Sequence, residues 1–132
     1  MQIEHIEVIP VRAPRKEVVR SASGVSLVSA SDFGIVRIVA DNGAEGLGEI
    51  SITFPQVGHA LCHAARNWLA PKLIGMDPLA LPAALKVIDA AMLGELSAPY
   101  LRAAFEMALL DMAGRHYGAP VYQLLGGRGR EA

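Results

Sequence analysis

The sequence contains a single cysteine, Cys62, among its 132 residues. One cysteine cannot form a disulfide within the chain, and this suits a protein of the reducing cytoplasm. Eighteen apolar residues never run together, and Glu4, His5 and Glu7 interrupt the first residues, where a secretory signal would have an apolar core. We therefore expect a cytoplasmic protein that does not enter a membrane.

Neither sign of charge is in excess. The chain has 12 basic and 13 acidic side chains, which gives a net charge of -1 at pH 7. This balance offers no electrostatic basis for binding nucleic acid or an anionic membrane. An apolar content of 52% argues against disorder, and a chain of this length can bury roughly two thirds of its unfolded surface in one core. No internal repeat or low-complexity segment is present, so we expect one globular domain.

Residues 2–12 predict an edge strand, because they are rich in β-branched residues and end at Pro10 and Pro14. The alternation is imperfect, since apolar side chains fall on both faces of this strand. Ile3 and Ile9 share one face, and Ile6 and Val8 share the other. We expect a bulge in the strand or burial on both sides.

Two more strands are predicted at residues 34–40 and 44–50. Residues 41–43, Asp-Asn-Gly, join them as a hairpin turn, because Asn and Gly tolerate the positive φ of tight turns. Residues 15–32 lack a helical stripe and predict strand at their two ends, with a mobile tip near residues 21–24. Three antiparallel strands are therefore expected to open the domain.

Three glycines of the returning strand, Gly43, Gly46 and Gly48, have a spacing that invites comparison with phosphate-binding loops. Such a loop follows a strand and opens a helix, so that its N–H groups can surround an anion. These glycines instead lie inside a hairpin. Close packing of the backbone against another element explains them better.

The second half of the chain predicts three helices. The first covers residues 57–69 and ends or kinks at Pro71. Its expected buried residues are Val57, Ala60, Leu61, Ala64 and Trp68. The second begins near Pro82 and stops at Gly94. Its expected buried residues are Leu81, Leu85, Ile88 and either Met92 or Leu93.

The third helix is predicted over residues 98–117 and has a regular apolar stripe at i, i+3 and i+4 spacing. The stripe consists of Leu101, Ala104, Phe105, Ala108, Leu109 and Met112. Ser97 is the expected N-cap, and Gly118 followed by Pro120 ends the helix. Asp111 and Arg115 are four residues apart and are expected to form an ion pair. A short apolar turn follows at residues 121–125.

One cluster on the first helix resembles a metal site. His59, Cys62 and His63 lie close together on the helix, and both imidazole and thiolate bind zinc. The sequence has no HExxH motif and no cysteine pair, so an ordinary helix surface is the preferred interpretation.

Two strings in the C-terminal part carry a family resemblance. Residues 103–115 read AAFEMALLDMAGR, and residues 118–127 read GAPVYQLLGG. Both resemble the signature of the mandelate racemase and muconate lactonizing enzyme family of the enolase superfamily. The opening IEHIEVIPVRAP and the hairpin IVRIVADNGAEGLGE are similar to earlier landmarks of that family, so the resemblance covers the whole chain.

The resemblance implies an α+β fold in residues 1–127: a three-stranded antiparallel sheet followed by a helical bundle, which forms the N-terminal capping domain. Residues 128–132 would begin the missing barrel domain or a linker. In complete family members a (β/α) barrel carries lysine or histidine bases and the carboxylates that hold magnesium, for removal of a proton α to a carboxylate. This chain contains no strand of that barrel, so the resemblance gives it no catalytic residue, no metal ligand and no cofactor.

The resemblance does give the chain a lid. Residues 15–33 and 50–56 resemble the two loops that close over the barrel mouth, exclude water and select the substrate. The expected substrate-capping residues are Arg20, Val25, Leu27, Thr53 and Phe54. Arg20 is the candidate partner of a substrate carboxylate, against the common alternative of a surface arginine.

Two functions remain open. The first is a capping and substrate-specificity domain of a magnesium-dependent isomerase or lyase, of racemase, cycloisomerase or dehydratase type. Alone it would be inactive, and it would meet its small carboxylate substrate only with the barrel present. The alternative is a non-catalytic binding or self-assembly module, possible as a homo-oligomer, which uses the surface that the barrel would cover. Leu124 and Leu125 would be exposed on that surface.

Overall fold

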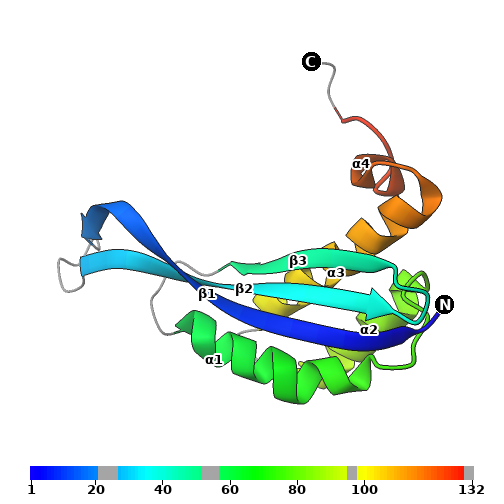
Figure 1. Ribbon diagram of the computed structural model, residues 1–132, viewed down its shortest axis with the longest axis horizontal. Helices are drawn as coiled ribbons and strands as arrows, with labels where there is room; N and C mark the ends of the chain where they lie inside the picture. Colours follow the sequence, from blue (N-terminus) through cyan, green and yellow to red (C-terminus); the bar gives the residue numbers. More distant parts are fainter. Residues whose placement is uncertain (21–26, 52–56, 95–97, 130–132) are drawn as a thin grey trace.

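The computed structural model describes residues 1–20, 27–51, 57–94 and 98–129. Three antiparallel strands form one sheet in the order β1-β2-β3, and helices pack on one face of it (Figure 1). The strands are β1 (Ile3–Arg20), β2 (Leu27–Ala40) and β3 (Glu45–Ser51). The helices are α1 (Val57–Ala64), the π-helical turn η1 (Ala65–Leu69), the 3-10 turn η2 (Ala70–Lys72), α2 (Leu81–Ala91), α3 (Ala98–Tyr117) and α4 (Val121–Leu124). The predicted α+β fold is confirmed.

β1 contains the predicted bulge. Its pairing with β2 shifts register between Ile3 and His5. Because of this shift Ile3, Ile6 and Val8 all face the helices and are buried, whereas Ile9 is 45% exposed on the opposite face. The apolar residues that seemed to fall on both faces are thereby sorted onto one.

The expected end of this strand at the two prolines is wrong. β1 continues through both, with Pro10 opposite Gly34 and Pro14 opposite Ala30, and it ends at Arg20. An edge strand tolerates proline where its backbone nitrogen does not face the neighbouring strand. The edge position of β1 itself is confirmed.

β1 and β2 extend well beyond β3. The last pair between β2 and β3 is Phe33 with Ser51, and past it residues 13–20 and 27–31 continue as a two-stranded ribbon, which we call the arm. Figure 1 shows the arm projecting from one end of the sheet. Strand at both ends of residues 15–32 is confirmed, while the predicted tip at residues 21–24 lies outside the described residues.

The turn between β2 and β3 is the predicted hairpin. Gly43 has a φ of 80°, and its N–H donates to the carbonyl oxygen of Ala40 at 2.9 Å. Positive φ at this position is the conformation that glycine adopts without strain.

α3 is the central helix of the core and has the predicted bounds. All six residues of its apolar stripe are fully buried. The helix ends as expected at Gly118, whose φ is 62°, and the N–H of Ala119 donates to the carbonyl oxygen of Gly114 at 2.9 Å. This bond closes a Schellman-type end. The predicted N-cap, Ser97, lies outside the described residues.

Gly46 and Gly48 let the backbones of α3 and β3 touch. A Cβ on Gly46 would lie 2.0 Å from the carbonyl oxygen of Ala108, and one on Gly48 would lie 1.9 Å from that of Ala104. No side chain fits at either position. The interpretation of these glycines as close-packing positions is confirmed.

The predicted buried face of the first helix is wrong by a rotation about its axis. The residues that face the core are Gly58, Leu61, Cys62, Ala65 and Leu69, while Val57 and Trp68 are exposed. Gly58 sets this rotation, because a Cβ there would lie only 2.8 Å from the Cβ of Asp32. Trp68 instead lies on the surface, where its indole N–H donates to the carbonyl oxygen of Ala91 at 3.2 Å.

α2 buries Ala84, Ile88 and, just after its end, Met92. Leu93, the alternative to Met92, is 87% exposed. Leu81 and Leu85 are partly buried against the core. None of the described helices is long and apolar enough to cross a membrane.

We predict that Gly48→Ala destabilises the domain by about 3 kcal/mol or more, because the added methyl group overlaps backbone rather than a movable side chain. Urea unfolding followed by circular dichroism measures the change. Gly129→Ala is the control, since a Cβ there meets nothing within 4 Å. Equal stability of the Gly48 variant and the wild type would show that α3 and β3 are not in backbone contact.

We also predict that the Cys62 thiol reacts with Ellman's reagent far more slowly in the folded chain than in urea. The side chain is buried, and this burial raises the pKa of the thiol, which lowers the fraction of reactive thiolate. Added Zn²⁺ is expected to leave the rate unchanged. Protection of the thiol by Zn²⁺ would revive the metal interpretation of His59, Cys62 and His63.

Candidate functional site on the arm and the open sheet face

The predicted substrate-capping residues belong to two segments that the structure describes in part. Arg20 is the last residue of β1, is exposed, and pairs with Leu27, the first residue of β2. These two positions therefore lie opposite each other at the far end of the arm. Val25, Thr53 and Phe54 lie outside the described residues, so their contacts with a substrate stay a prediction.

The arm is rich in cations. Arg15, Lys16 and Arg20 follow Arg12 along β1, with Glu17 as the one acid among them. The Nε of Arg15 is buried and has no hydrogen-bond partner among the described residues. A positively charged arm attracts anions, so its charge suits a carboxylate ligand.

A buried ion pair lies at the base of the arm. Arg12 donates from Nε to Oδ1 of Asp32 at 2.7 Å and from a terminal guanidinium nitrogen to Oδ2 at 3.0 Å. The Asp32 side chain is fully buried, whereas that of Arg12 is 54% exposed. The two-pronged bond raises the pKa of Arg12. His59 of α1 lies beside this pair, with Nε2 at 4.0 Å from Oδ2 of Asp32.

The face of the sheet opposite the helices, which we call the open face, has a charged half and an apolar half. In the charged half Arg37 bridges Glu7 at 3.1 Å and Glu45 at 2.7 Å, and His5 lies 3.2 Å from Glu7. The hydrogen bond from Arg37 holds the pKa of Glu7 below its usual value. This network neutralises itself, so it offers no unpaired charge to a ligand.

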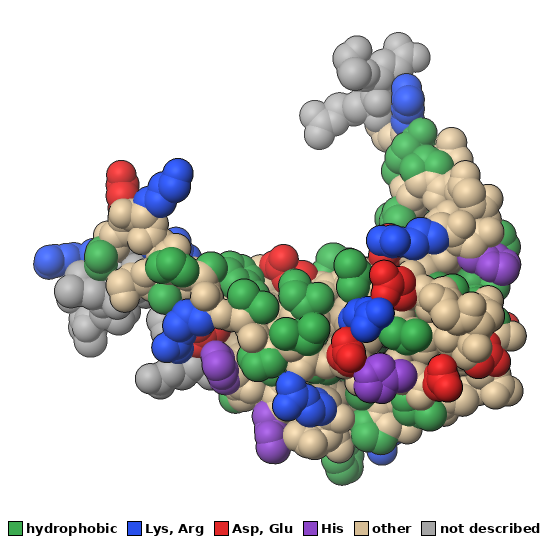
Figure 2. All heavy atoms as spheres, viewed as in Figure 1, with side chains coloured by type: hydrophobic (Ala, Val, Ile, Leu, Met, Phe, Trp, Pro, Cys, Tyr) green, Lys and Arg blue, Asp and Glu red, His purple; other side chains and the backbone are tan. Residues whose placement is uncertain are grey.

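The apolar half lies nearer the arm. Cross-strand partners share a face, which places Ile9 beside Ile35 and Val11 beside Phe33. Ile9, Val11, Leu47 and Met107 of α3 are exposed although they are large and apolar. Ile35, Leu47, Gly48, Glu49 and Met107 line a shallow hollow here. Figure 2 shows hydrophobic side chains gathered on the side of the molecule that is concave between the arm and the C-terminal segment.

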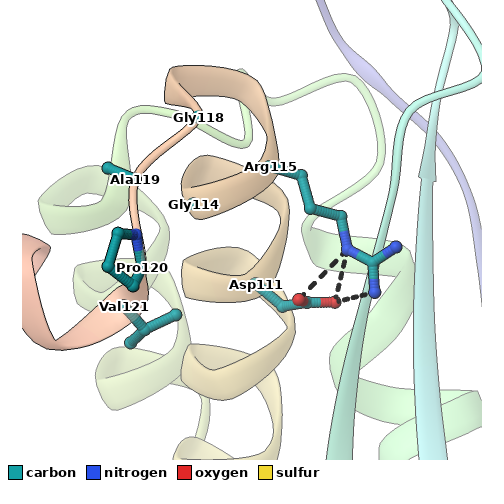
Figure 3. A pocket seen from close by; sticks show the side chains of 7 residues that line it. All are labelled: Asp111, Gly114, Arg115, Gly118, Ala119, Pro120 and Val121. Carbon is teal, nitrogen blue, oxygen red and sulfur yellow. Dashed lines mark hydrogen bonds and ion pairs between the residues drawn. The ribbon is translucent and has the colours of Figure 1, made fainter.

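A second hollow lies where α3 meets α4 (Figure 3). Its polar groups are already used, because Asp111 accepts hydrogen bonds from Arg115 at 3.1 Å and from the backbone N–H of Leu47 at 2.9 Å. The predicted ion pair between Asp111 and Arg115 is thus confirmed. The hollow offers no free acid or base for catalysis.

The described residues do not fit a magnesium ion or any other metal ion. Across residues 1–20, 27–51, 57–94 and 98–129, no three His, Cys, Asp or Glu side chains converge on one point. In the cluster singled out from the sequence, Cys62 points into the core, and the ring of His63 lies 3.1 Å from the side-chain nitrogen of Asn67. We therefore derive no chemical step from a metal held by these residues.

The sequence analysis missed Arg12 and Asp32. They are 20 residues apart and meet only because β1 and β2 pair in one register. The available signal was a lone acid directly before the apolar run of β2, a place where a buried charge needs a partner. The apolar half of the open face was missed for the same reason, since the β1 bulge decides which side chains reach it.

Comparisons with known proteins agree with the fold and with the resemblance. Residues 5–126 match the model of the mandelate racemase / muconate lactonizing enzyme family, N-terminal domain. The chain is 35% identical to an L-Ala-D/L-Glu epimerase from Clostridium acetobutylicum, covering 95% of this chain and 33% of that protein. It is 34% identical to a cis-3-hydroxy-L-proline dehydratase from Roseibium aggregatum, covering 99% of this chain and 36% of that protein.

Among solved structures, the muconate lactonizing enzyme from Pseudomonas fluorescens, in complex with muconolactone, superposes with a TM-score of 0.86 at 29% identity. The match covers 97% of this chain and 34% of that one. The chain therefore spans about a third of the length of the relatives that it matches. On this evidence the chain belongs to the mandelate racemase and muconate lactonizing enzyme family of the enolase superfamily, and it is an N-terminal domain of that family.

Proposed function

We propose that this domain caps the active site of a longer, magnesium-dependent enzyme that removes a proton α to a carboxylate, and that it selects the substrate. The observation that carries the proposal is the match to the N-terminal third of an epimerase, a dehydratase and a lactonizing enzyme. Magnesium and its ligands would come from a barrel domain, because the described residues of this chain offer no metal site.

The exposed apolar residues support this proposal. The apolar half of the open face and α4 both carry large side chains that water surrounds in this chain, including Leu47, Met107 and Leu125. A second domain packed along the concave side would bury them. The cationic arm would then reach over the mouth of the barrel, where Arg20, Val25, Leu27, Thr53 and Phe54 are the proposed contacts with a carboxylate substrate.

The mechanistic contribution of this domain would be positional. A closed cap excludes water, and the lower dielectric strengthens the electrostatic interactions that stabilise negative charge developing on the substrate. None of these effects needs an acid or base from this chain. The proposed contacts would act on which carboxylate is bound.

A second function is favoured by one observation. Leu125 is 66% exposed, and Leu124 and Tyr122 on the same helix are also exposed. These residues could hold two copies together, and the chain would then be a self-assembly module without catalysis. Sedimentation of the purified chain distinguishes the two functions only together with the activity test below, because an uncovered domain interface can also self-associate.

We predict that the 132-residue chain neither binds Mg²⁺ in calorimetry nor exchanges the α proton of carboxylates in D₂O with Mg²⁺ present, as followed by NMR. Joined to the barrel of the epimerase relative, in place of that enzyme's own N-terminal domain, it should support exchange. Metal-dependent exchange by the isolated chain would overturn the proposal. Silence of a folded fusion would favour the self-assembly module.

In the active fusion, Arg20→Ala should raise KM about tenfold or more while kcat changes little, because a charge-assisted hydrogen bond to substrate is lost in the ground state and the transition state alike. Lys86→Ala is the matched control, since Lys86 is an exposed cation on α2, away from the arm. An unchanged KM for Arg20→Ala would remove Arg20 from the substrate site.

A further inference from the structure

The ion pair between Arg12 and Asp32 stands where the sheet changes character. Phe33 and Ser51 are the last partners of β2 and β3, and Arg12 opposite Asp32 is the next pair along the hairpin. On one side of this pair the sheet has three strands and helices beneath it. On the other side only the two-stranded arm continues (Figure 1).

A charge is a costly choice at this position. The Asp32 side chain is fully buried, and removing a carboxylate from water is unfavourable unless strong hydrogen bonds replace the solvent. An apolar side chain would fill the same space without that cost. What the carboxylate adds is direction, because two hydrogen bonds to a planar guanidinium fix the relative orientation of both groups.

Asp32 also touches the start of α1. A Cβ on Gly58 would lie 2.8 Å from the Cβ of Asp32 and 2.9 Å from its carbonyl oxygen, and Nε2 of His59 lies 4.0 Å from its carboxylate. Asp32 is therefore the point where β1, β2 and α1 meet. One ring further along, Gly34 packs against Cys62 in the same way, since a Cβ there would lie 2.5 Å from Sγ of Cys62.

Beyond this point the arm has few means of holding its direction. Lys16, Glu17 and Val18 are exposed on β1, and the register with β2 shifts between Pro14 and Val19. A two-stranded ribbon without a packed face is only marginally stable by itself. Its orientation relative to the helices must therefore be set at its base.

We propose that Asp32 is a positioning residue that, through Arg12 and the first turn of α1, fixes the direction of the arm relative to the body of the domain. Its effect on substrate selection rests on the proposed function, because that function places substrate contacts at the end of the arm. The orientation of the arm does not depend on that function and can be measured on this chain alone.

The test is amide hydrogen exchange followed by NMR on the 132-residue chain with Asp32→Asn. Amides of residues 16–20 and 27–31 that are protected in the wild type should exchange about tenfold faster or more, while amides of α3 change less than twofold. Asp89→Asn is the matched control, because Asp89 also accepts a hydrogen bond from an arginine, Arg102, at 2.8 Å but lies on α2. It should leave the arm unchanged.

Two results would overturn the proposal. Unchanged arm exchange means that Asp32 does not hold the arm, and an equal rise in α3 and the arm means that it only stabilises the whole domain. Should Asp32→Asn fail to fold, Arg12→Lys replaces it, since Arg12 is half exposed and lysine keeps the charge but loses the two-pronged bond. The same pattern of exchange is expected there.

The functional consequence has its own readout in the fusion to a barrel. Asp32→Asn should raise KM about as much as Arg20→Ala does, with little change in kcat, and the two effects should not add, since both act through the same arm. Faster arm exchange with an inactive fusion would count against the proposed function and leave the positioning role standing. Active fusion with unchanged KM would confine Asp32 to the structure of the arm.

Discussion

The backbone contact between α3 and β3 is the constraint on which the rest of this domain depends. With no side chain at Gly46 or Gly48, the helix lies directly on the strand. This contact fixes the position of α3, whose six buried residues form the centre of the core. It also brings Asp111 to the edge of the sheet, where it accepts the N–H of Leu47 and covers a backbone group that would otherwise be open to pairing.

Close approach through glycine recurs at the other end of the sheet, with a different purpose. Gly34 and Gly58 allow α1 to lie against β2, and the fully buried Asp32 is enclosed between them with its arginine partner. The first contact builds a rigid apolar body, and the second places a charge at the base of the arm. The domain thus combines a packed centre with an extension whose direction is set by few interactions.

The surface of this domain divides in the same way. The charged half of the open face is self-neutralising, since Arg37 satisfies both Glu7 and Glu45. The apolar half and α4 expose large side chains along a concave side, between the arm and the C-terminal segment. Such a distribution fits a domain that covers another body. It agrees with a family in which this domain makes up about a third of the relatives' length.

The sequence by itself determined the fold class, the order of the elements, the bounds of α3 and the family, because those depend on local periodicity, on turn residues and on a contiguous signature. Tertiary structure decided which face of α1 is buried, how far β1 runs through its prolines and which acid meets Arg12. Each of these depends on contacts between residues far apart in the chain. A hydrophobic stripe gives the period of a helix but not its rotation when small residues such as Gly58 allow the closest approach, and a 20-residue pairing appears only once the strand register is fixed.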